Sequence, residues 1–448
     1  MKRLRRALTL ARRYPTVTGS LFIILALVGI SIYAVVSIPL SEAIASWSVA
    51  SRGRSERPRF AQPTWTNLFR REKLPETIVI SMDDVGTTTE PLSDTVWRET
   101  TVLAFDYKSS RFPSDLSFFF DIECAELEPR LTLTWVMPDG RETRLYRDNV
   151  RPGGRAFWIS QDATLPRTLG ERVVVGLFAD PETRERERGP EALQGRYALR
   201  VEALAFEEGF SMTGRLIVYG GVYGIAGTDD ERRDLAIGLL WGTPIALMFG
   251  LLATIGTTVL GFIIAAVGSW FGGWVGAAVQ RITEVNLMLP FLPIVMMVGK
   301  FYSSSLWVML AFIIGLNIFS AAIKTYRAMF LQVKNAPYIE AARAYGASNT
   351  RIIFRYLIPR IVPVLVPNFV LGIPQFVFIE ASLAILGLGD PTLPTWGKIM
   401  ADARVGAVYQ GHLYWILQPS ILLIITGLSF SMLGFALDRV FNPRLRGI

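Results

Sequence analysis

Long uncharged apolar segments alternate along this chain with charged ones. No charged residue occurs between Asp234 and Arg281, and further uncharged segments cover residues 301–323, 361–379 and 405–437. Segments of about 20 apolar residues match the hydrocarbon thickness of a bilayer, whereas the buried helices of soluble proteins are usually shorter. The pattern therefore predicts an α-helical integral membrane protein.

The N-terminal part of the chain begins with a similar apolar segment. A first span is predicted over residues 17–38, because its apolar core follows a basic flank and is longer than that of a signal peptide. A cleaved signal peptide is the alternative, since Ala43-Ile44-Ala45 resembles a cleavage site. A charged, proline-containing linker follows at residues 50–74.

Residues 75–220 carry short runs of β-branched and aromatic residues, which are typical of strands. Turn sequences such as Pro138-Asp139-Gly140 separate these runs. Strands are predicted at residues 77–81, 101–108, 116–122, 131–136, 156–159, 173–178, 197–203 and 216–219. About eight short strands at this spacing predict an all-β domain, either a sandwich or a small barrel.

The formal net charge of +8 is distributed unevenly. Residues 1–15 carry six Lys or Arg and no acid, and residues 324–360 carry seven Lys or Arg and one Glu. Residues 41–240 instead carry 26 Lys or Arg and 32 Asp or Glu. Basic segments beside spans stay in the cytoplasm, which predicts cytoplasmic termini, a cytoplasmic 324–360 loop and an extracytoplasmic insert at 39–226. Nucleic-acid binding is the alternative, but the basic segments lack interleaved aromatic residues and adjoin apolar spans.

The predicted sides of the membrane determine the number of spans. An odd number of spans must separate the insert from the 324–360 loop. Three spans fit if residues 268–283, which contain four glycines, form a turn at the cytoplasmic interface. The total is then six, and the predicted parts are a cytoplasmic N-terminus at 1–16, the first span at 17–38, the insert at 39–226 with its β domain at about 75–220, a five-helix domain at 235–437 and a cytoplasmic tail at 438–448.

The 324–360 loop contains the most informative motif. It reads Tyr-Ile-Glu-Ala-Ala-Arg-Ala-Tyr-Gly from Tyr338 to Gly346, and Pro359 follows. The alanines favour a short helix with small side chains, which a partner surface can approach closely. Glu340 lies near the helix start, where a carboxylate is favourable, and Gly346 suits the left-handed conformation that ends a helix. A solvated amphipathic loop helix is the simpler alternative.

This motif resembles the EAA loop of binding-protein-dependent ABC transporter permeases. Gly-Thr-Asp at 227–229 and Arg-Asp at 233–234 resemble the entry to the transmembrane domain of the oligopeptide/dipeptide permease family, C-type subunit. Leu-Gly-Leu-Gly at 386–389, Pro-Thr-Trp-Gly at 394–397 and the ending at 438–444 resemble later segments of that family. The chain departs from the family pattern where a glycine is usual, at Glu231 or Arg232, and the long insert has no counterpart in the resemblance.

The resemblance implies a permease subunit of an ATP-driven importer for oligopeptides, dipeptides or a similar small solute. It implies the ABC type-1 importer permease fold with six transmembrane helices, in the cell (inner or plasma) membrane. It also implies partners: ABC ATPase subunits, a second homologous permease subunit and an extracytoplasmic substrate-binding protein, all working within membrane lipid. By the same resemblance, the residues that couple to the ATPase are Glu340, Ala341, Ala342, Arg343, Ala344 and Gly346.

Polar residues inside the apolar segments are candidates for the translocation pathway. Exposure of such groups to lipid is costly, so they usually face a protein interior or a water-filled path. Hydrogen bonding between helices is the alternative role of each one. The candidates are Asn286, Asn317, Asn368, Gln375 and Glu380.

Catalysis by this chain is not expected. A single cysteine, Cys124, excludes an internal disulfide, and a single histidine, His412, removes the commonest general base and zinc ligand from most of the chain. No G-x-x-x-x-G-K-[ST] phosphate loop occurs, so we expect no nucleotide site, no metal and no cofactor. The alternative function is a membrane-anchored extracytoplasmic receptor or scaffold with a functional β domain, but it does not account for the motif at 338–346.

Overall fold

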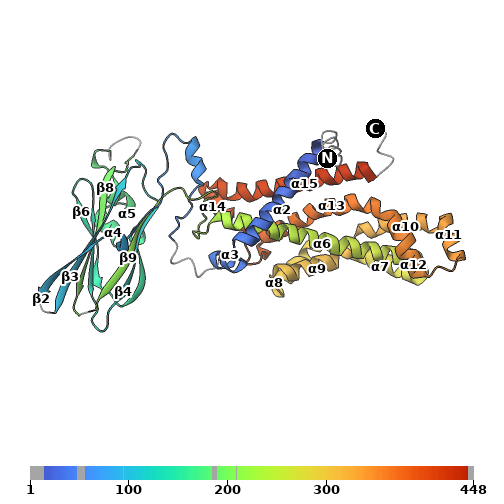
Figure 1. The fold of residues 1–448 in the computed structure, drawn as a ribbon, viewed down its shortest axis with the longest axis horizontal. Helices are drawn as coiled ribbons and strands as arrows, with labels where there is room; N and C mark the ends of the chain where they lie inside the picture. Colours follow the sequence, from blue (N-terminus) through green and yellow to red (C-terminus); the bar gives the residue numbers. More distant parts are fainter. Residues whose placement is uncertain (1–14, 48–55, 94, 184–188, 208, 442–448) are drawn as a thin grey trace, which may run out of the picture. The chain divides into compact units, whose positions relative to one another are not determined.

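The chain forms two compact units (Figure 1). One unit is Ala45–Ala236, and the other combines Met1–Ile44 with Ile237–Ile448. The 227–234 segment, which resembles the entry to a permease domain, therefore folds with the insert. The computed structural model describes residues 15–47, 56–93, 95–183, 189–207 and 209–441, so the basic stretch at 1–14 and the ending at 442–444 lie outside the described residues.

The unit Ala45–Ala236 is a sandwich of two antiparallel sheets, which confirms the predicted all-β domain. One sheet has the strand order β1-β9-β4-β7, and the other has the order β2-β3-β8-β5-β6. The strands are β1 Ile78–Ser81, β2 Thr87–Ser93, β3 Val96–Tyr107, β4 Asp115–Glu123, β5 Arg130–Val136, β6 Glu142–Asn149, β7 Gly153–Trp158, β8 Gly195–Ala205 and β9 Ser211–Tyr219. Short helices join them: η2 Thr64–Phe69, η3 Met82–Asp84, η4 Ile159–Gln161, α4 Leu165–Leu169, α5 Val173–Phe178 and η5 Pro181–Thr183.

Alternating side chains of the strands build the core of this sandwich. In β8 every second residue from Tyr197 to Ala205 is buried, as a strand with one face toward a core requires. Trp135 of β5 is fully buried, packs against Phe178 and Tyr197, and donates its indole N–H to Leu177 O at 3.1 Å. The buried indole is therefore both packed and hydrogen-bonded.

Residues 173–178 form a helix, so the strand predicted there is wrong. A short apolar run fits a buried helix as well as a strand, because its length and composition do not separate the two. In α5 the run buries Val173, Leu177 and Phe178, and Gly176 lies against Leu169 of α4. Strands β2 and β6 were not predicted, because both are largely polar and exposed edge strands without an apolar alternation.

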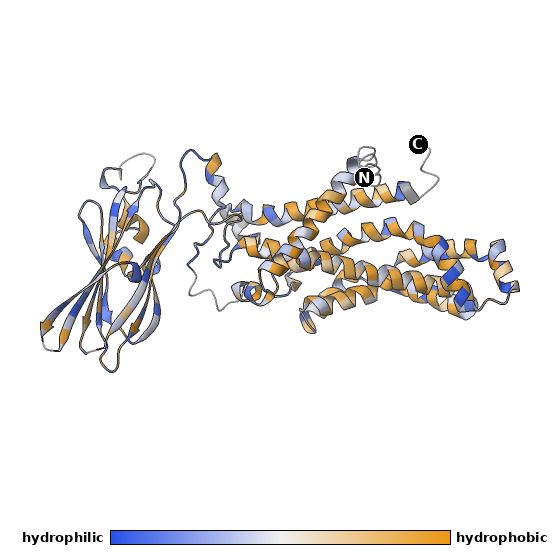
Figure 2. Ribbon diagram, in the orientation of Figure 1, coloured by the Kyte–Doolittle hydropathy of each residue, from blue (hydrophilic) through white to orange (hydrophobic). Residues whose placement is uncertain are grey.

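The second unit is helical. Hydrophobic residues cover its long helices, and hydrophilic residues gather around α10, α11 and α12 at one end (Figure 2). Its helices are α2 Pro15–Ser37, α3 Leu40–Trp47, α6 Leu235–Phe271, α7 Gly273–Met288, α8 Phe291–Phe301, α9 Leu306–Ile318, α10 Ala321–Lys334, α11 Pro337–Ala344, α12 Asn349–Ile352, α13 Ile358–Leu383, α14 Trp396–Gln410 and α15 Leu413–Phe441, with π-helical turns η6 Ile353–Leu357 and η7 Ala384–Leu388.

Four stretches of this unit are each long and apolar enough to cross a membrane. They are Pro15–Ser37, Leu235–Phe271, Asn349–Leu388 and Leu413–Arg439. Two further helix pairs qualify only together, α7 with α8, bent by 76°, and α9 with α10, bent by 44°. The described residues thus contain four spans, or up to six if each bent pair counts as one.

Close helix packing explains the Pro-Thr-Trp-Gly segment. Trp396, the first residue of α14, is fully buried and donates its indole N–H to Leu239 O of α6 at 3.0 Å. The ring lies over Gly242, where an added Cβ would come within 2.3 Å of Trp396 Cδ1. Gly397 likewise lies against the α13 backbone at Ala381. The two glycines therefore allow the ring to fill the space between α6 and α13.

We expect Gly242→Ala to destabilise the helical unit. The added methyl group forces Trp396 out of its position, and overpacking of this kind costs about 1–3 kcal/mol of unfolding free energy. Thermal unfolding of the purified chain in detergent measures the effect. Gly315→Ala is the matched control, since the structure leaves open space at that helical glycine, and it should be neutral or slightly stabilising. Equal melting temperatures for the two variants would contradict the packing argument.

Candidate functional site

The motif at 338–346 folds as a separate short helix with defined ends. Pro337 occupies the first turn of α11, where its missing N–H costs nothing, and Glu340 also lies in the first turn. Gly346 has φ of 74°, and Ala347 N donates to Ala342 O at 3.0 Å, which closes the C-terminus. The helix and its glycine end were both predicted.

The two faces of α11 differ in exposure. Ile339 and Ala342 are buried against the helical unit, in a cluster with Phe330 of α10 and Ile353 of η6. The opposite face is exposed and consists of Tyr338, Glu340, Ala341, Ala344 and Tyr345, the last 91% exposed. Of the predicted coupling residues, Ala342 therefore packs within its own chain, while Glu340, Ala341, Arg343 and Ala344 are exposed.

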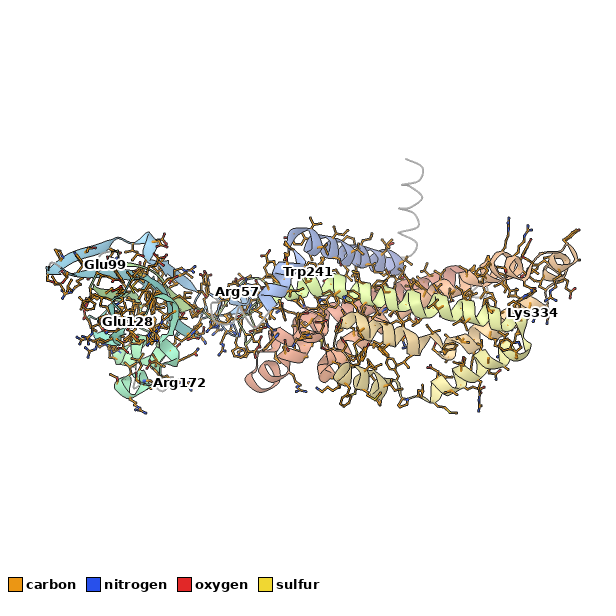
Figure 3. The ribbon with its side chains drawn as sticks, turned by 90° about the horizontal axis from the view of Figure 1, so that it is seen from below. Arg57, Glu99, Glu128, Arg172, Trp241 and Lys334 are labelled. Atoms are coloured by element: carbon orange, nitrogen blue, oxygen red, sulfur yellow. The ribbon has the colours of Figure 1, made fainter. Side chains whose placement is uncertain are left out.

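A tryptophan at the end of α6 holds the segments around α11 together. The Arg343 guanidinium lies 4.3 Å from the centre of the Trp270 ring, and Trp270 donates its indole N–H to Asn349 Oδ1 of α12 at 3.1 Å. Lys334, at the end of α10, donates to the carbonyl oxygens of Ser269 and Trp270 at 3.0 and 2.7 Å (Figure 3). Trp270 carries no signal in the sequence, because its partners come from three separate segments.

Two of the predicted pathway residues share an exposed face of α13. Asn368 and Gln375 are both exposed, and Ser382 is the next exposed polar residue at the same interval. Residues seven apart lie two turns apart on one face of a helix. A polar stripe therefore runs along a helix that is otherwise apolar and long enough to span a membrane.

The other three predicted pathway residues lie elsewhere. Asn286 of α7 donates to the carbonyl oxygens of Leu316 and Phe319 at 2.8 and 3.1 Å, so it ties α7 to the end of α9. Asn317 donates to Ile313 O of its own helix at 2.8 Å. Glu380 is buried, and its Oε2 has no hydrogen-bond partner within the described part of the chain.

The 227–234 segment is a tightly hydrogen-bonded turn. Thr228 is fully buried; its hydroxyl donates to Pro58 O at 2.7 Å and accepts from Ala61 N at 3.0 Å. Asp229 is also fully buried and accepts from the Arg233 side chain (Nε) at 2.5 Å and from the Arg233 backbone N at 2.8 Å. Burial raises the pKa of Asp229 to about 6, although Arg233 favours the charged form. Thr228 and Asp229 of the Gly-Thr-Asp motif therefore stabilise this turn.

Arg232 has an unusual backbone and a fully engaged side chain. Its φ is 64°, a left-handed conformation that disfavours residues other than glycine. The guanidinium lies beside the stacked rings of Trp158 and Tyr219, at 4.4 and 4.3 Å from their centres. It forms a buried ion pair with Asp115 at 2.5 Å and donates to Arg57 O at 2.7 Å. Burial lowers the pKa of this guanidinium from its ordinary value.

These contacts explain the departure from the family pattern at Glu231 or Arg232. The left-handed φ identifies Arg232 as the position that suits glycine. Here the backbone strain is retained together with a side chain that joins the turn to β4, β7 and β9 of the sandwich. Neither the strain nor the aromatic partners can be inferred from a single arginine in sequence.

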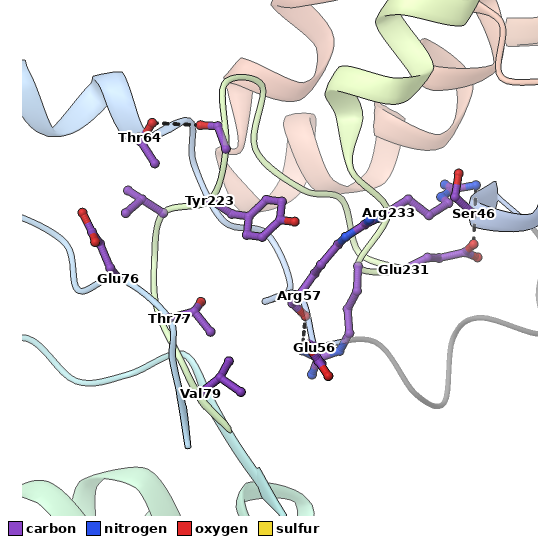
Figure 4. A pocket seen from close by; sticks show the side chains of 13 residues that line it. Ser46, Glu56, Arg57, Thr64, Glu76, Thr77, Val79, Tyr223, Glu231 and Arg233 are labelled. Atoms are coloured by element: carbon purple, nitrogen blue, oxygen red, sulfur yellow. Dashed lines mark hydrogen bonds and ion pairs between the residues drawn. The ribbon is translucent and has the colours of Figure 1, made fainter. Parts of the chain in front are cut away.

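A cavity of about 820 Å³ lies beside this turn (Figure 4). Arg232 and Arg233 belong to its lining, but both guanidinium groups already pair with buried carboxylates. They therefore serve to fold the unit. The remaining lining carries both signs of charge and includes Glu56, Arg57, Glu76, Tyr223 and Glu231.

Among the described residues, no group of three or more His, Cys, Asp and Glu could hold a metal ion. Cys124 is a free thiol at the end of β4, and burial is the main cause that raises its pKa.

Comparisons with known proteins concern the helical unit. Residues 239–447 match the family described as binding-protein-dependent transport system inner membrane component. A glutathione transport system permease protein, GsiD of Pectobacterium atrosepticum, is 30% identical over 223 residues, which cover 49% of this chain and 72% of that protein. The dipeptide transport system permease protein DppC of Bacillus subtilis is 29% identical over 223 residues, covering 49% and 68%. The inward-facing MetNI methionine ABC transporter aligns with a TM-score of 0.37 at 20% identity, covering 46% of this chain and 96% of that chain.

We expect Arg232→Ala to destabilise the unit Ala45–Ala236 by about 3–5 kcal/mol, because it leaves Asp115 buried without its charge partner. Arg232→Gly should cost about 1–2 kcal/mol less, since glycine removes the backbone strain. Pulse proteolysis of the full chain in detergent, read at cleavage sites within this unit, measures both losses.

Arg200→Ala is the control for the loss of an arginine. Arg200 pairs with Glu142 on the surface of the same unit, where an ion pair contributes about 1 kcal/mol or less. A loss at Arg232 no larger than that at Arg200, or equal stability of the Arg232→Ala and Arg232→Gly variants, would contradict the assignment.

Proposed function

This chain belongs to the binding-protein-dependent transport system inner membrane component family, among its peptide permeases, and from this premise we propose how it works. It is the permease subunit of an ABC importer for peptides or a peptide-like solute such as glutathione. It carries no nucleotide site of its own, so ATP is hydrolysed in ABC ATPase subunits that bind its cytoplasmic face. A second permease subunit and an extracytoplasmic binding protein complete the importer.

The observation that carries this proposal is the two-faced helix α11. Its buried face is fixed to the helical unit through Ile339 and Ala342, and its exposed face presents Glu340, Ala341 and Ala344. Small exposed side chains allow another protein surface to approach the backbone closely. A helix that is rigid toward its own unit and open toward a partner is suited to transmit a displacement as a rigid body.

Contacts of Trp270 can transmit a displacement of α11 to α6. Arg343 of α11 stacks on Trp270, which is the penultimate residue of α6. Arg343 is exposed, and a cation stacked on an aromatic ring at an exposed site contributes about 0.5–1 kcal/mol. Movement of α11 therefore moves the end of α6, and α6 continues without interruption for 37 residues to the point where the insert begins.

The polar stripe on α13 provides one wall of the path. Asn368, Gln375 and Ser382 are exposed on a span-length helix, where contact with lipid would be unfavourable. We assign them to the surface that faces the second permease subunit across the pathway. Asn286, Asn317 and Glu380 are not assigned to this wall, because Asn286 bonds the end of α9, Asn317 bonds its own helix and Glu380 is buried inside the bundle.

The sides of the membrane follow from the chain path. The insert joins α6 at Leu235, and α11 contacts α6 at its opposite end. If α6 spans the bilayer, the insert and α11 lie on opposite sides. We place α11 in the cytoplasm because the 324–360 loop is basic, and therefore the insert on the extracytoplasmic side; by the same charge rule, we place both termini in the cytoplasm.

Substitutions on the exposed face of α11 should uncouple the importer without unfolding it. Ala344→Arg and Glu340→Lys place bulk or the wrong charge on the ATPase-facing surface, and we expect loss of co-purification with the ATPase subunit and loss of ATP-driven uptake. Gln332→Arg on exposed α10 is the control and should keep both. Uptake at the wild-type rate in the two α11 variants, with unchanged melting temperatures, would refute the coupling role.

Labelling with a membrane-impermeant maleimide tests the sides independently. In a Cys124→Ser background, Ala341→Cys should react only from the cytoplasmic side and Leu127→Cys only from the extracytoplasmic side. Both positions are exposed, so reactivity reports access across the bilayer. Inside-out and right-side-out vesicles without the ATPase subunit provide the two comparisons. Reaction of both cysteines from one side would overturn the proposed topology.

A further inference from the structure

The most exposed large apolar side chains among the described residues of the insert lie together. Leu68 and Phe69, at the end of η2, are 82% and 83% exposed, and Ile225 is 79% exposed. Trp65 of η2 packs edge-on against Phe69 and donates its indole N–H to Ile225 O at 2.9 Å. These four residues, from two segments far apart in sequence, form what we call the apolar rim. The end of η2 stands out as hydrophobic in Figure 2.

The apolar rim is held firmly by hydrogen bonds. Asn67 and Leu74 close the loop between them reciprocally, through Nδ2 to Leu74 O at 3.1 Å and Leu74 N to Oδ1 at 3.0 Å. Thr64 donates both its N–H and its hydroxyl to Gly224 O, each at 2.9 Å. Ordering a loop costs conformational entropy, so a loop fixed with its large apolar side chains outward indicates that something covers them.

Basic residues follow the apolar rim directly. Arg70, Arg71 and Lys73 lie in the closed loop, and the acid among them, Glu72, forms an ion pair with Arg111 at 3.0 Å. The loop therefore carries an excess of positive charge beside exposed Trp, Leu and Phe. This combination is characteristic of segments that lie in the headgroup region of a bilayer containing anionic lipid.

The apolar rim also lies next to the start of a membrane helix. Gly227, two residues after Ile225, accepts a hydrogen bond from Leu235 N at 3.1 Å, and Leu235 is the first residue of α6. The rim is thus close to the point where the chain becomes continuously apolar. Every copy of the protein in a membrane has a lipid surface near this point.

We propose that the apolar rim, together with Arg70, Arg71 and Lys73, is a membrane-interface anchor whose partner is the anionic lipid surface. Leu68, Phe69 and Ile225 enter the boundary between headgroups and acyl chains, and Trp65 lies at headgroup level. The basic side chains contact lipid phosphates. The anchor restrains the insert at the membrane surface. The inference depends on the membrane location of the family and not on the identity of the transported solute or on the role of α11.

The depth of a nitroxide probe on the full chain tests the anchor. Leu68→Cys in the Cys124→Ser background carries the probe, and the chain is reconstituted alone into phosphatidylglycerol-containing vesicles. We expect a severalfold higher ratio of oxygen to nickel-chelate accessibility at Leu68→Cys than at the control, Leu127→Cys. Leu127 is an exposed leucine on the β4–β5 loop, among acidic residues. Phe69→Cys provides a second probe position on the anchor and should behave as Leu68→Cys does.

Each outcome decides the proposal. Equal water accessibility at Leu68→Cys and Leu127→Cys overturns it, and so does shielding of Leu68→Cys that appears only after the binding protein or second permease subunit is added. Arg71→Glu with Lys73→Glu should shift the Leu68 probe toward water in phosphatidylglycerol vesicles and less so in phosphatidylcholine. An unchanged depth in the anionic vesicles would overturn the role of the basic residues. Failure of the anchor leaves the coupling experiment on α11 unaffected.

Discussion

The contact between Arg343 and Trp270 is the interaction on which the proposed mechanism depends. An indole at the end of α6 is stacked on one side by a guanidinium, bonded through its N–H to Asn349, and held through its backbone by Lys334. Four segments of the helical unit therefore meet at one side chain. Without it, α11 would rest on apolar contacts alone, and the direction of its movement would be poorly defined.

The turn at the end of the insert is stabilised by a comparable but more costly arrangement. The backbone of Arg232 is strained and its side chain is buried, and both are unfavourable. Contacts of the guanidinium with two aromatic rings and with Asp115 offset these costs. A glycine would form the turn with less backbone strain, but it has no side chain to contact the sandwich. The arginine makes the turn part of the sandwich, so the last residues before α6 are as ordered as the sheet itself.

Much of this organisation could be predicted from hydrophobic patterning. Apolar length located the four long apolar helices, and short apolar runs located seven strands, because burial acts directly on those patterns. The polar edge strands β2 and β6 carry no such pattern, and the apolar run of α5 fits two structures equally well. The face of a helix on which a given residue lies was harder still to predict. Asn368 and Asn317 look alike in sequence, yet one is exposed and the other bonds its own helix; Ala342 differs from Ala341 only in the face it occupies.

The length of α6 has a consequence for how the protein fits its bilayer. Its 37 residues extend about 55 Å, against a hydrocarbon core of about 30 Å. Tilts of transmembrane helices rarely exceed about 40°, so tilt alone does not absorb this hydrophobic mismatch. Part of α6 must therefore extend beyond the acyl chains at one end or at both. A thicker or thinner membrane would enclose a longer or shorter part of this helix and change its tilt, so acyl-chain length is a physical variable for the helical unit.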